Sequence, residues 1–151
     1  MGKKDDSKKV LKDVAEKLLG DGKSLRIPAE GYSMFPSIRP GNIILIDPVD
    51  DPDKLKPGDI IAWTRDSDIV VHRLIMIAER KGQKRFVTCG DSSLGSDKPV
   101  STARIVGKVE YTEVAGKTVK LRSDIPGDKM RRLNRIRAKT IMIIRLKIIR
   151  L

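Results

Sequence analysis

Cysteine, histidine and aromatic residues are scarce in this chain of 151 residues, which contains one Cys, one His and only 3% Phe, Trp and Tyr. A single Cys excludes a disulfide framework and a cysteine-based zinc site, and a single His excludes a multi-histidine metal centre. No loop has the carboxylate spacing of a calcium site, so we expect no metal and no other cofactor. With so few aromatic residues, the core must consist mainly of Ile, Val, Leu and Met.

Long apolar segments are also missing. No uninterrupted apolar run approaches the ~18–20 residues that a membrane-spanning helix needs, and the first residues have a basic flank without the apolar region of a secretory signal. We therefore expect a cytoplasmic protein, or one attached peripherally to a membrane. The composition, 39% apolar and 34% charged, is that of a folded chain, and the length allows one domain with a short appendage.

The net charge of +12 is concentrated near the carboxyl end. Residues 117–151 contain 12 Lys and Arg and two Asp, a balance of +10, whereas residues 1–116 carry only +2. Such a basic tail favours an anionic surface, either membrane lipid or nucleic-acid phosphate. The tail has no aromatic side chain to stack on bases, and residues 1–24 are too short for a helix-turn-helix. We expect residues 127–151 to contact an anionic membrane surface, and we do not expect a nucleic acid partner.

The pattern of apolar residues divides the chain into three parts. Residues 1–24 form an N-terminal amphipathic helix and linker, residues 25–116 form a β-rich domain, and residues 117–151 form a final strand and a basic amphipathic tail. In the first part, helical spacing predicts a helix over residues 7–19, ending at Gly20-Asp21-Gly22, with an apolar stripe of Val10, Leu11, Val14 and Leu18.

The middle part alternates short apolar segments with clusters of Gly, Pro and Asp. These segments predict strands over residues 43–46, 60–63, 69–77, 86–89 and 105–109. Turn residues recur about every ten positions, which favours a curled antiparallel sheet or small barrel over a parallel sheet with crossover helices. The fold class that we predict is therefore mainly β.

The tail begins after the turn Ile125-Pro126-Gly127-Asp128. Beyond that turn, apolar residues recur with helical spacing among Arg and Lys residues, which predicts a basic amphipathic helix. Residues 144–148 also alternate between apolar and basic side chains, so the pattern leaves a terminal strand open as an alternative.

The sequence contains the residue types that a serine nucleophile and its general base need. Ser33 lies on a stiff loop ahead of a strand, His72 lies within an apolar strand, and Asp91 and Asp97 lie on a turn rich in Gly and Ser. A serine hydroxyl needs a general base to attack a carbonyl, and a carboxylate can orient that base. Either Asp would complete the set. The alternative interpretation is a Ser that stabilises a turn, a strand histidine with satisfied ring nitrogens, and two Asp that cap turns.

Five motifs then follow one another in a recognisable order. They are Ser33-Met34-Phe35-Pro36, Lys56-Pro57-Gly58-Asp59-Ile60, His72-Arg73, Thr88-Cys89-Gly90-Asp91 with Asp97 six residues on, and Ile105-Val106-Gly107-Lys108-Val109. This order resembles the signal peptidase I family, among the signal-peptidase/LexA-like serine peptidases, over roughly residues 25–110. The resemblance implies a LexA/signal-peptidase-like curled antiparallel β-fold, with a short N-terminal helix and a basic C-terminal helix in this chain, and hydrolysis of peptide bonds after small residues.

The resemblance also implies roles for individual residues. Bacterial leader peptidases and LexA-like repressors have a lysine as the base, whereas this chain is similar to the branch that has a histidine. By resemblance, Ser33 is the nucleophile, His72 the general base and Asp97 the orienting acid, with Asp91 supporting the same site. Spacing alone leaves open which Asp contacts His72. The substrate-binding residues that we predict are Met34 and Pro36.

Two features depart from the family pattern. The family usually has Ser-Gly before the catalytic serine, where this chain has Gly31-Tyr32. The side-chain oxyanion donor is therefore absent, and backbone N–H groups, including that of Ser33, would have to stabilise the oxyanion. Residues 1–30 also contain no apolar segment like the usual N-terminal membrane anchor, so the chain is expected to lack that anchor.

The sequence therefore predicts a serine endopeptidase of signal peptidase type that cleaves leader or signal peptides through an acyl-enzyme. Two alternatives belong to other classes. One is a peptide-binding or regulatory module that keeps the fold without turnover, which the missing oxyanion hydroxyl favours. The other is a basic protein associated with nucleic acid, which the charge of the tail favours.

Overall fold

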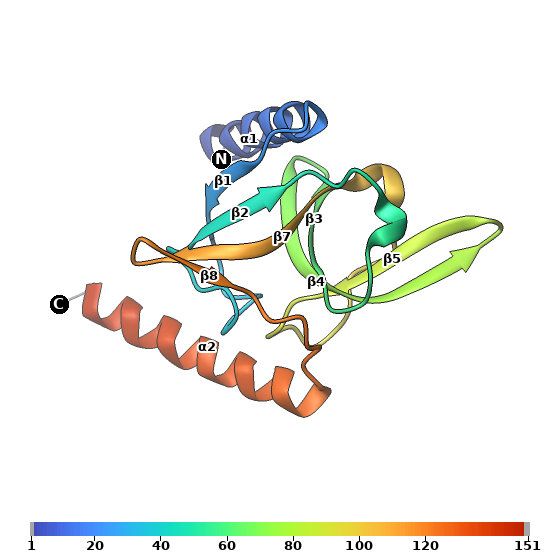
Figure 1. Cartoon of the computed structure of the whole chain (residues 1–151). Coiled ribbons are helices and arrows are strands. Elements are labelled where there is room, and N and C mark those ends of the chain that lie inside the picture. Colours follow the sequence, from blue (N-terminus) through green and yellow to red (C-terminus); the bar gives the residue numbers. More distant parts are fainter. Residues whose placement is uncertain (1, 150–151) are drawn as a thin grey trace.

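An antiparallel sheet forms the centre of the molecule in the computed structural model, which describes residues 2–149 (Figure 1). Eight strands are present in this part of the chain, in the order β1-β2-β7-β3-β4-β5-β6, with β8 paired to β7. They are β1 (Leu25–Pro28), β2 (Ile43–Asp47), β3 (Ile60–Arg65), β4 (Asp68–Arg80), β5 (Gln83–Cys89), β6 (Val100–Ser101), β7 (Ile105–Val114) and β8 (Lys117–Lys120).

The mainly β fold class is confirmed, and the five strands predicted from the sequence are β2, β3, β4, β5 and β7. Strands β1 and β6 were not predicted individually. They have only four and two residues, too few to show a clear alternation of apolar and polar side chains. Two short 3-10 helices, η1 (Pro52–Lys54) and η2 (Thr102–Arg104), complete the connections within the sheet.

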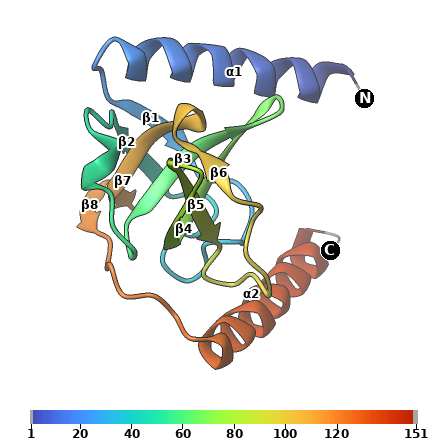
Figure 2. The same ribbon diagram turned by 90° about the vertical axis from the view of Figure 1, so that its right-hand side faces the viewer.

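Two helices lie at opposite ends of the sheet, α1 (Gly2–Gly20) and α2 (Asp128–Ile149) (Figures 1 and 2). Helix α1 ends near the predicted glycine turn but begins earlier than residue 7. Helix α2 begins at the predicted turn and includes residues 144–148, so the alternative of a terminal strand there is wrong. Among the residues that the structure describes, neither helix is long and apolar enough to cross a membrane.

Strand β3 is buried on both faces because the sheet curls around it. Ile60 and Ala62 belong to one apolar cluster, whereas Ile61 and Trp63 belong to a second cluster on the other face. This double burial explains why β3 is an unbroken run of buried residues from Ile60 to Thr64 instead of an alternating pattern.

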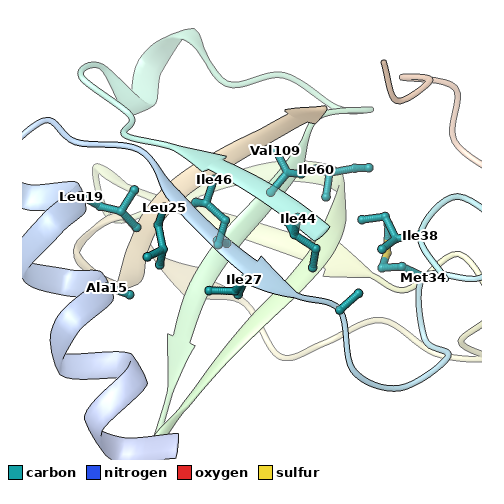
Figure 3. Packing of buried hydrophobic residues seen from close by; sticks show 12 residues of the cluster. Ala15, Leu19, Leu25, Ile27, Met34, Ile38, Ile44, Ile46, Ile60 and Val109 are labelled. Atoms are coloured by element: carbon teal, nitrogen blue, oxygen red, sulfur yellow. The ribbon is translucent and has the colours of Figure 1, made fainter. Parts of the chain in front are cut away.

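The first apolar cluster joins α1 to strands β1 and β2 (Figure 3). The pairing of Leu25 with Ile46 and of Ile27 with Ile44 places alternate side chains of both strands on the face that α1 covers. From α1 itself, Ala15 and Leu19 enter this cluster at 0% and 5% exposure.

The apolar stripe predicted for α1 is therefore partly wrong. Val10, Leu11 and Val14 are exposed, and Leu18 only packs at the edge of the cluster. The helix is rotated so that Ala15 and Leu19 face the sheet, because a small side chain at position 15 allows a closer approach of the helix backbone.

Candidate active site

Ser33, His72 and Asp97 come together from three separate parts of the fold. Ser33 lies on the loop between β1 and β2, His72 lies in β4, and Asp97 lies on the loop between β5 and β6. Ser33 Oγ is 3.0 Å from His72 Nε2, and His72 Nδ1 is 2.6 Å from Asp97 Oδ2. Ser33 is exposed, whereas His72 and Asp97 are half-buried.

The two contacts of His72 determine the arrangement of its protons. A carboxylate only accepts hydrogen bonds, so the contact with Asp97 assigns the proton of the neutral imidazole to Nδ1. Nε2 is then free to accept the hydroxyl proton of Ser33. This is the arrangement that a general base needs before it activates a serine.

Asp97 is held in place by the end of β5. Its backbone N–H donates to the Thr88 carbonyl at 2.8 Å, and its Oδ2 accepts from Thr88 Oγ at 2.7 Å. Burial alone would raise the pKa of the Asp97 carboxyl, but the hydrogen bond and charge of His72 and the hydrogen bond from Thr88 outweigh it, so this pKa lies below its ordinary value. Asp97 therefore remains an ionised partner for His72.

Asp91 does not contact His72 and occupies a different place. Its carboxylate accepts two hydrogen bonds from Arg73, and a third from the Ser37 hydroxyl on the loop that carries Ser33. Nη1 of Arg73 donates to the carbonyls of Gly58 and Arg122 at 2.9 and 2.7 Å, and Nη2 also reaches Ser37 Oγ at 3.4 Å. Asp91 thus links the loop of Ser33 to the strand of His72 without touching either side chain.

The backbone of Ser33 is fixed by the loop that follows β5. The carbonyl of Ser33 accepts a hydrogen bond from the N–H of Ser92 at 2.9 Å, and the Ser92 hydroxyl lies 2.6 Å from the Tyr32 carbonyl and 3.1 Å from the Ser33 carbonyl. Gly90 makes this approach feasible, because a Cβ at that position would lie 2.5 Å from the Ser33 carbonyl oxygen and 2.4 Å from Ser93 Oγ. The glycine in the predicted motif is therefore required by close packing of two loops.

A cleft of about 610 Å³ opens at Ser33 and His72, and we call it the apolar cleft because most of its lining is apolar. Arg65 and the ion pair of Lys8 with Asp68 also line it. Its walls come from residues 27–31, which continue from β1, and from residues 68–72 of β4, with Leu11 of α1 at one side. Met34 lines the cleft, in the place predicted for a substrate-binding residue, whereas Pro36 is not among its lining residues.

The oxyanion of an acyl intermediate would have to be stabilised by backbone groups. Gly31 has a φ of 73°, in the left-handed region that side-chain-bearing residues rarely adopt, so the loop does not favour a serine there. Within residues 2–149, the N–H of Ser33 donates to no protein acceptor. This N–H is therefore available as an oxyanion donor.

Cys89 lies near the site but has the character of a core residue. It is 2% exposed, its Sγ contacts the carbonyls of Gly90 and Gly95, and burial raises the pKa of its thiol. A thiol with a raised pKa is a poor nucleophile. Across the described residues, no group of three or more His, Cys, Asp and Glu is arranged to hold a metal ion.

Sequence reasoning missed several residues that support the site. Ser37, Ser92 and Asn134 hold the loops around Ser33, through bonds to the Asp91 carboxylate, the Ser33 carbonyl and the Asp91 carbonyl. Serine and asparagine on loops and helices are common, and no spacing in the sequence distinguishes these three from solvent-exposed residues.

Comparisons with known proteins show the family of this chain. The Peptidase S24-like family model matches residues 4–110, a segment that contains Ser33, His72 and Asp97. Signal peptidase I W of Bacillus subtilis (strain 168) is 32% identical over 82 residues, which are 53% of this chain and 42% of that protein. The chain thus matches less than half the length of that relative, and no solved structure matches it. Because the family match extends over most of the chain and includes the whole Ser–His–Asp arrangement, the chain belongs to the Peptidase S24-like family.

Proposed function

We propose that this protein is a serine endopeptidase that cleaves leader or signal peptides after small residues. The observation that carries the proposal is the continuous hydrogen-bonded path from Ser33 Oγ through His72 to Asp97. A nucleophile, a base within reach of its proton and a carboxylate that orients the base are together the requirements for acyl-enzyme catalysis. The similarity to a signal peptidase supports the choice of substrate.

In this mechanism, Ser33 Oγ bonds to the scissile carbonyl carbon while its proton moves to His72 Nε2. The carbon–nitrogen bond then breaks, and His72 returns the proton to the departing amine. A water molecule, deprotonated by His72, hydrolyses the ester and frees Ser33. Asp97 stabilises the imidazolium that forms in each half of the cycle, and the Ser33 N–H stabilises the oxyanion.

Two strand edges at the cleft favour the binding of an extended peptide. Strand β1 is at the end of the sheet order, so one of its edges is unpaired among the strands that the structure describes. Within residues 2–149, residues 68–72 of β4 pair with β3 only, since the pairing with β5 begins at Arg73. Both segments line the cleft beside Ser33. An extended chain bound there gains backbone hydrogen bonds without regard to its side chains.

The first test is mass-spectrometric analysis of a diverse peptide pool incubated with the intact protein. We expect cuts after small residues that disappear in Ser33→Ala and His72→Ala and persist in Cys89→Ala. If the intact protein makes no cut that the Ser33→Ala variant lacks, the peptidase proposal fails. The remaining alternative is then a peptide-binding module on the same fold.

The end of α2 further suggests where the enzyme works. Its last turns present exposed large apolar side chains on several sides, together with Arg145 and Lys147 and no acidic residue; these are Met142, Ile143, Ile144, Leu146, Ile148 and Ile149. We call residues 142–149 the apolar tip. Apolar side chains flanked by cations match the interface of an anionic membrane, so we propose that the apolar tip attaches the enzyme to one.

Sedimentation with vesicles tests this attachment. We expect the protein to bind vesicles that contain phosphatidylglycerol more strongly than vesicles of phosphatidylcholine alone, and the variant Ile144→Ser/Ile148→Ser to lose the binding. A control variant, Lys23→Glu/Lys117→Glu, changes the charge on other elements and should retain binding to the anionic vesicles. Equal binding of the Ile144→Ser/Ile148→Ser variant would contradict the proposal.

A further inference from the structure

A second hollow adjoins Ser33, and its wall is α2, which lies outside the family-matched segment. This hollow, of about 260 Å³, is lined by Ser33 and Ser93 from the two site loops and by Arg135, Lys139 and Met142 from α2. A neighbouring hollow of about 410 Å³ shares Arg135 and Lys139. The nucleophile therefore has the apolar cleft at one side and a basic surface at the other.

Helix α2 is held in this place by specific contacts with the site loops. Asn134 Nδ2 donates to the Asp91 carbonyl at 3.0 Å, and the guanidinium of Arg137 lies 5.8 Å from the centre of the Phe35 ring. Asn134 and Ala138 are 2% and 5% exposed. Figures 1 and 2 show α2 beneath the loops that follow β1 and β5. These contacts position the turns that carry Arg135 and Lys139.

The cations of this surface have no acidic partner in the described part of the protein. The chain has no Asp or Glu after Asp128, which pairs with Arg131. Among the ion pairs of residues 2–149, none involves Arg132, Arg135 or Lys139, and no acidic residue lines either hollow. Arg135 is also half-buried, so its charge is less screened than that of a fully exposed side chain.

The geometry points to an anion subsite beside the nucleophile: Arg135 and Lys139 select acidic side chains, Asp or Glu, on the side of the scissile bond that lies against α2. This inference rests on the proposed peptidase function and names its substrate class more closely. The apolar cleft takes residues on one side of the bond, and the surface of α2 takes acidic residues on the other. The preference is an electrostatic one, since the hollow is open and lined by long flexible cations.

Matched peptides test the subsite. Each peptide has Ala at its centre, and Gln is replaced by Glu at the three positions before Ala in one set and after Ala in the other. We expect kcat/KM to be about fivefold higher for Glu than for Gln on one side of the cleaved bond only. This ratio should be smaller at high salt. The variant Arg135→Glu/Lys139→Glu should prefer Gln on that side, whereas Lys23→Glu/Lys117→Glu, with the same change in net charge, should keep the preference for Glu.

The outcomes separate the subsite from the peptidase function. Cleavage without a preference between Glu and Gln overturns the subsite and leaves the peptidase intact. If no peptide is cleaved, the affinities of the Ser33→Ala protein for the same peptides test the subsite instead. Tighter binding of Glu peptides than of Gln peptides supports the subsite if the further changes Arg135→Glu/Lys139→Glu abolish the difference. Equal binding of the two kinds of peptide, or no binding, overturns it. If that double variant loses binding to anionic vesicles but keeps the preference for Glu, the cations serve a membrane and the subsite is again overturned.

Discussion

Arg73 and Asp91 form a buried ion pair with two parallel hydrogen bonds, Nε to Oδ1 and Nη2 to Oδ2, each 2.8 Å long. Both residues are 1% exposed. Arg73 directly follows His72 in the chain, and Asp91 directly precedes Ser92, which binds the Ser33 carbonyl. The pair therefore sets the position of the base relative to the nucleophile, although neither residue touches the reacting atoms.

Removing one member of this pair should destabilise the protein strongly. Arg73→Met leaves the Asp91 carboxylate buried and without its cation, and we expect the free energy of unfolding to fall by about 3–5 kcal/mol. The double variant Arg73→Met/Asp91→Leu removes both charges and should recover part of that loss. Urea unfolding measures both values. If the double variant loses as much unfolding free energy as Arg73→Met and Asp91→Leu added together, the pair does not act as a unit.

Asp97→Asn should reduce turnover while preserving the fold. The amide can donate to His72 Nδ1, which favours the tautomer with a proton on Nε2, and that nitrogen can no longer accept the Ser33 proton. We expect kcat to fall by about 10⁴-fold with KM little changed. The control Thr88→Val removes one hydrogen bond to Asp97 but keeps the carboxylate, and its loss should be much smaller. Full activity of Asp97→Asn would show that this carboxylate does not orient the base.

The lowered pKa of Asp97 predicts how stability depends on pH. The unfolded chain has the ordinary value of 3.8, and the folded protein has a lower one, so the unfolded state takes up the proton first as the pH falls. The stabilisation is therefore present above the unfolded pKa and disappears as the pH falls through the folded pKa. We expect the difference in unfolding free energy between the wild type and Asp97→Asn to be constant near neutral pH and to shrink in acid. A constant difference down to the lowest pH would contradict this.

Gly90→Ala should impair catalysis by moving the nucleophile. The added methyl group would lie 2.5 Å from the Ser33 carbonyl oxygen, so the two site loops must separate. We expect a loss of kcat of more than about tenfold, because small displacements of a nucleophile are costly. A methyl group added to Gly95, on the same loop, would have no neighbour within 4 Å, so Gly95→Ala is the matched control with nearly unchanged activity. Equal activities of the two variants would contradict the packing argument.

Much of this protein was predictable from local pattern. Alternating apolar segments and clusters of Gly, Pro and Asp located five strands, and the turn at Pro126-Gly127 located the start of α2. These features follow from the backbone preferences of neighbouring residues and need no knowledge of the rest of the chain. The chemistry of Ser33 and His72 also follows from residue type, and the order of the motifs indicated the family.

Other features depend on residues that are far apart in the sequence. Asp91 and Asp97 have the same chemistry, and only the packing of β5 against the turn after it places Asp97 at His72 and Asp91 at Arg73. The buried face of α1 was decided in the same way, by the sheet that covers Ala15 and Leu19.

The place of α2 beside Ser33 was likewise decided by the tertiary structure. A sequence shows that residues 128–149 can form a basic helix, but the bond from Asn134 to the Asp91 carbonyl joins positions 43 residues apart. Such contacts form only when the sheet has closed and the loops have met, because their energy depends on distance and direction between groups that the unfolded chain keeps apart. The sequence by itself therefore determined the strands, the turns and the reactive groups, whereas the tertiary structure decided which of these groups meet.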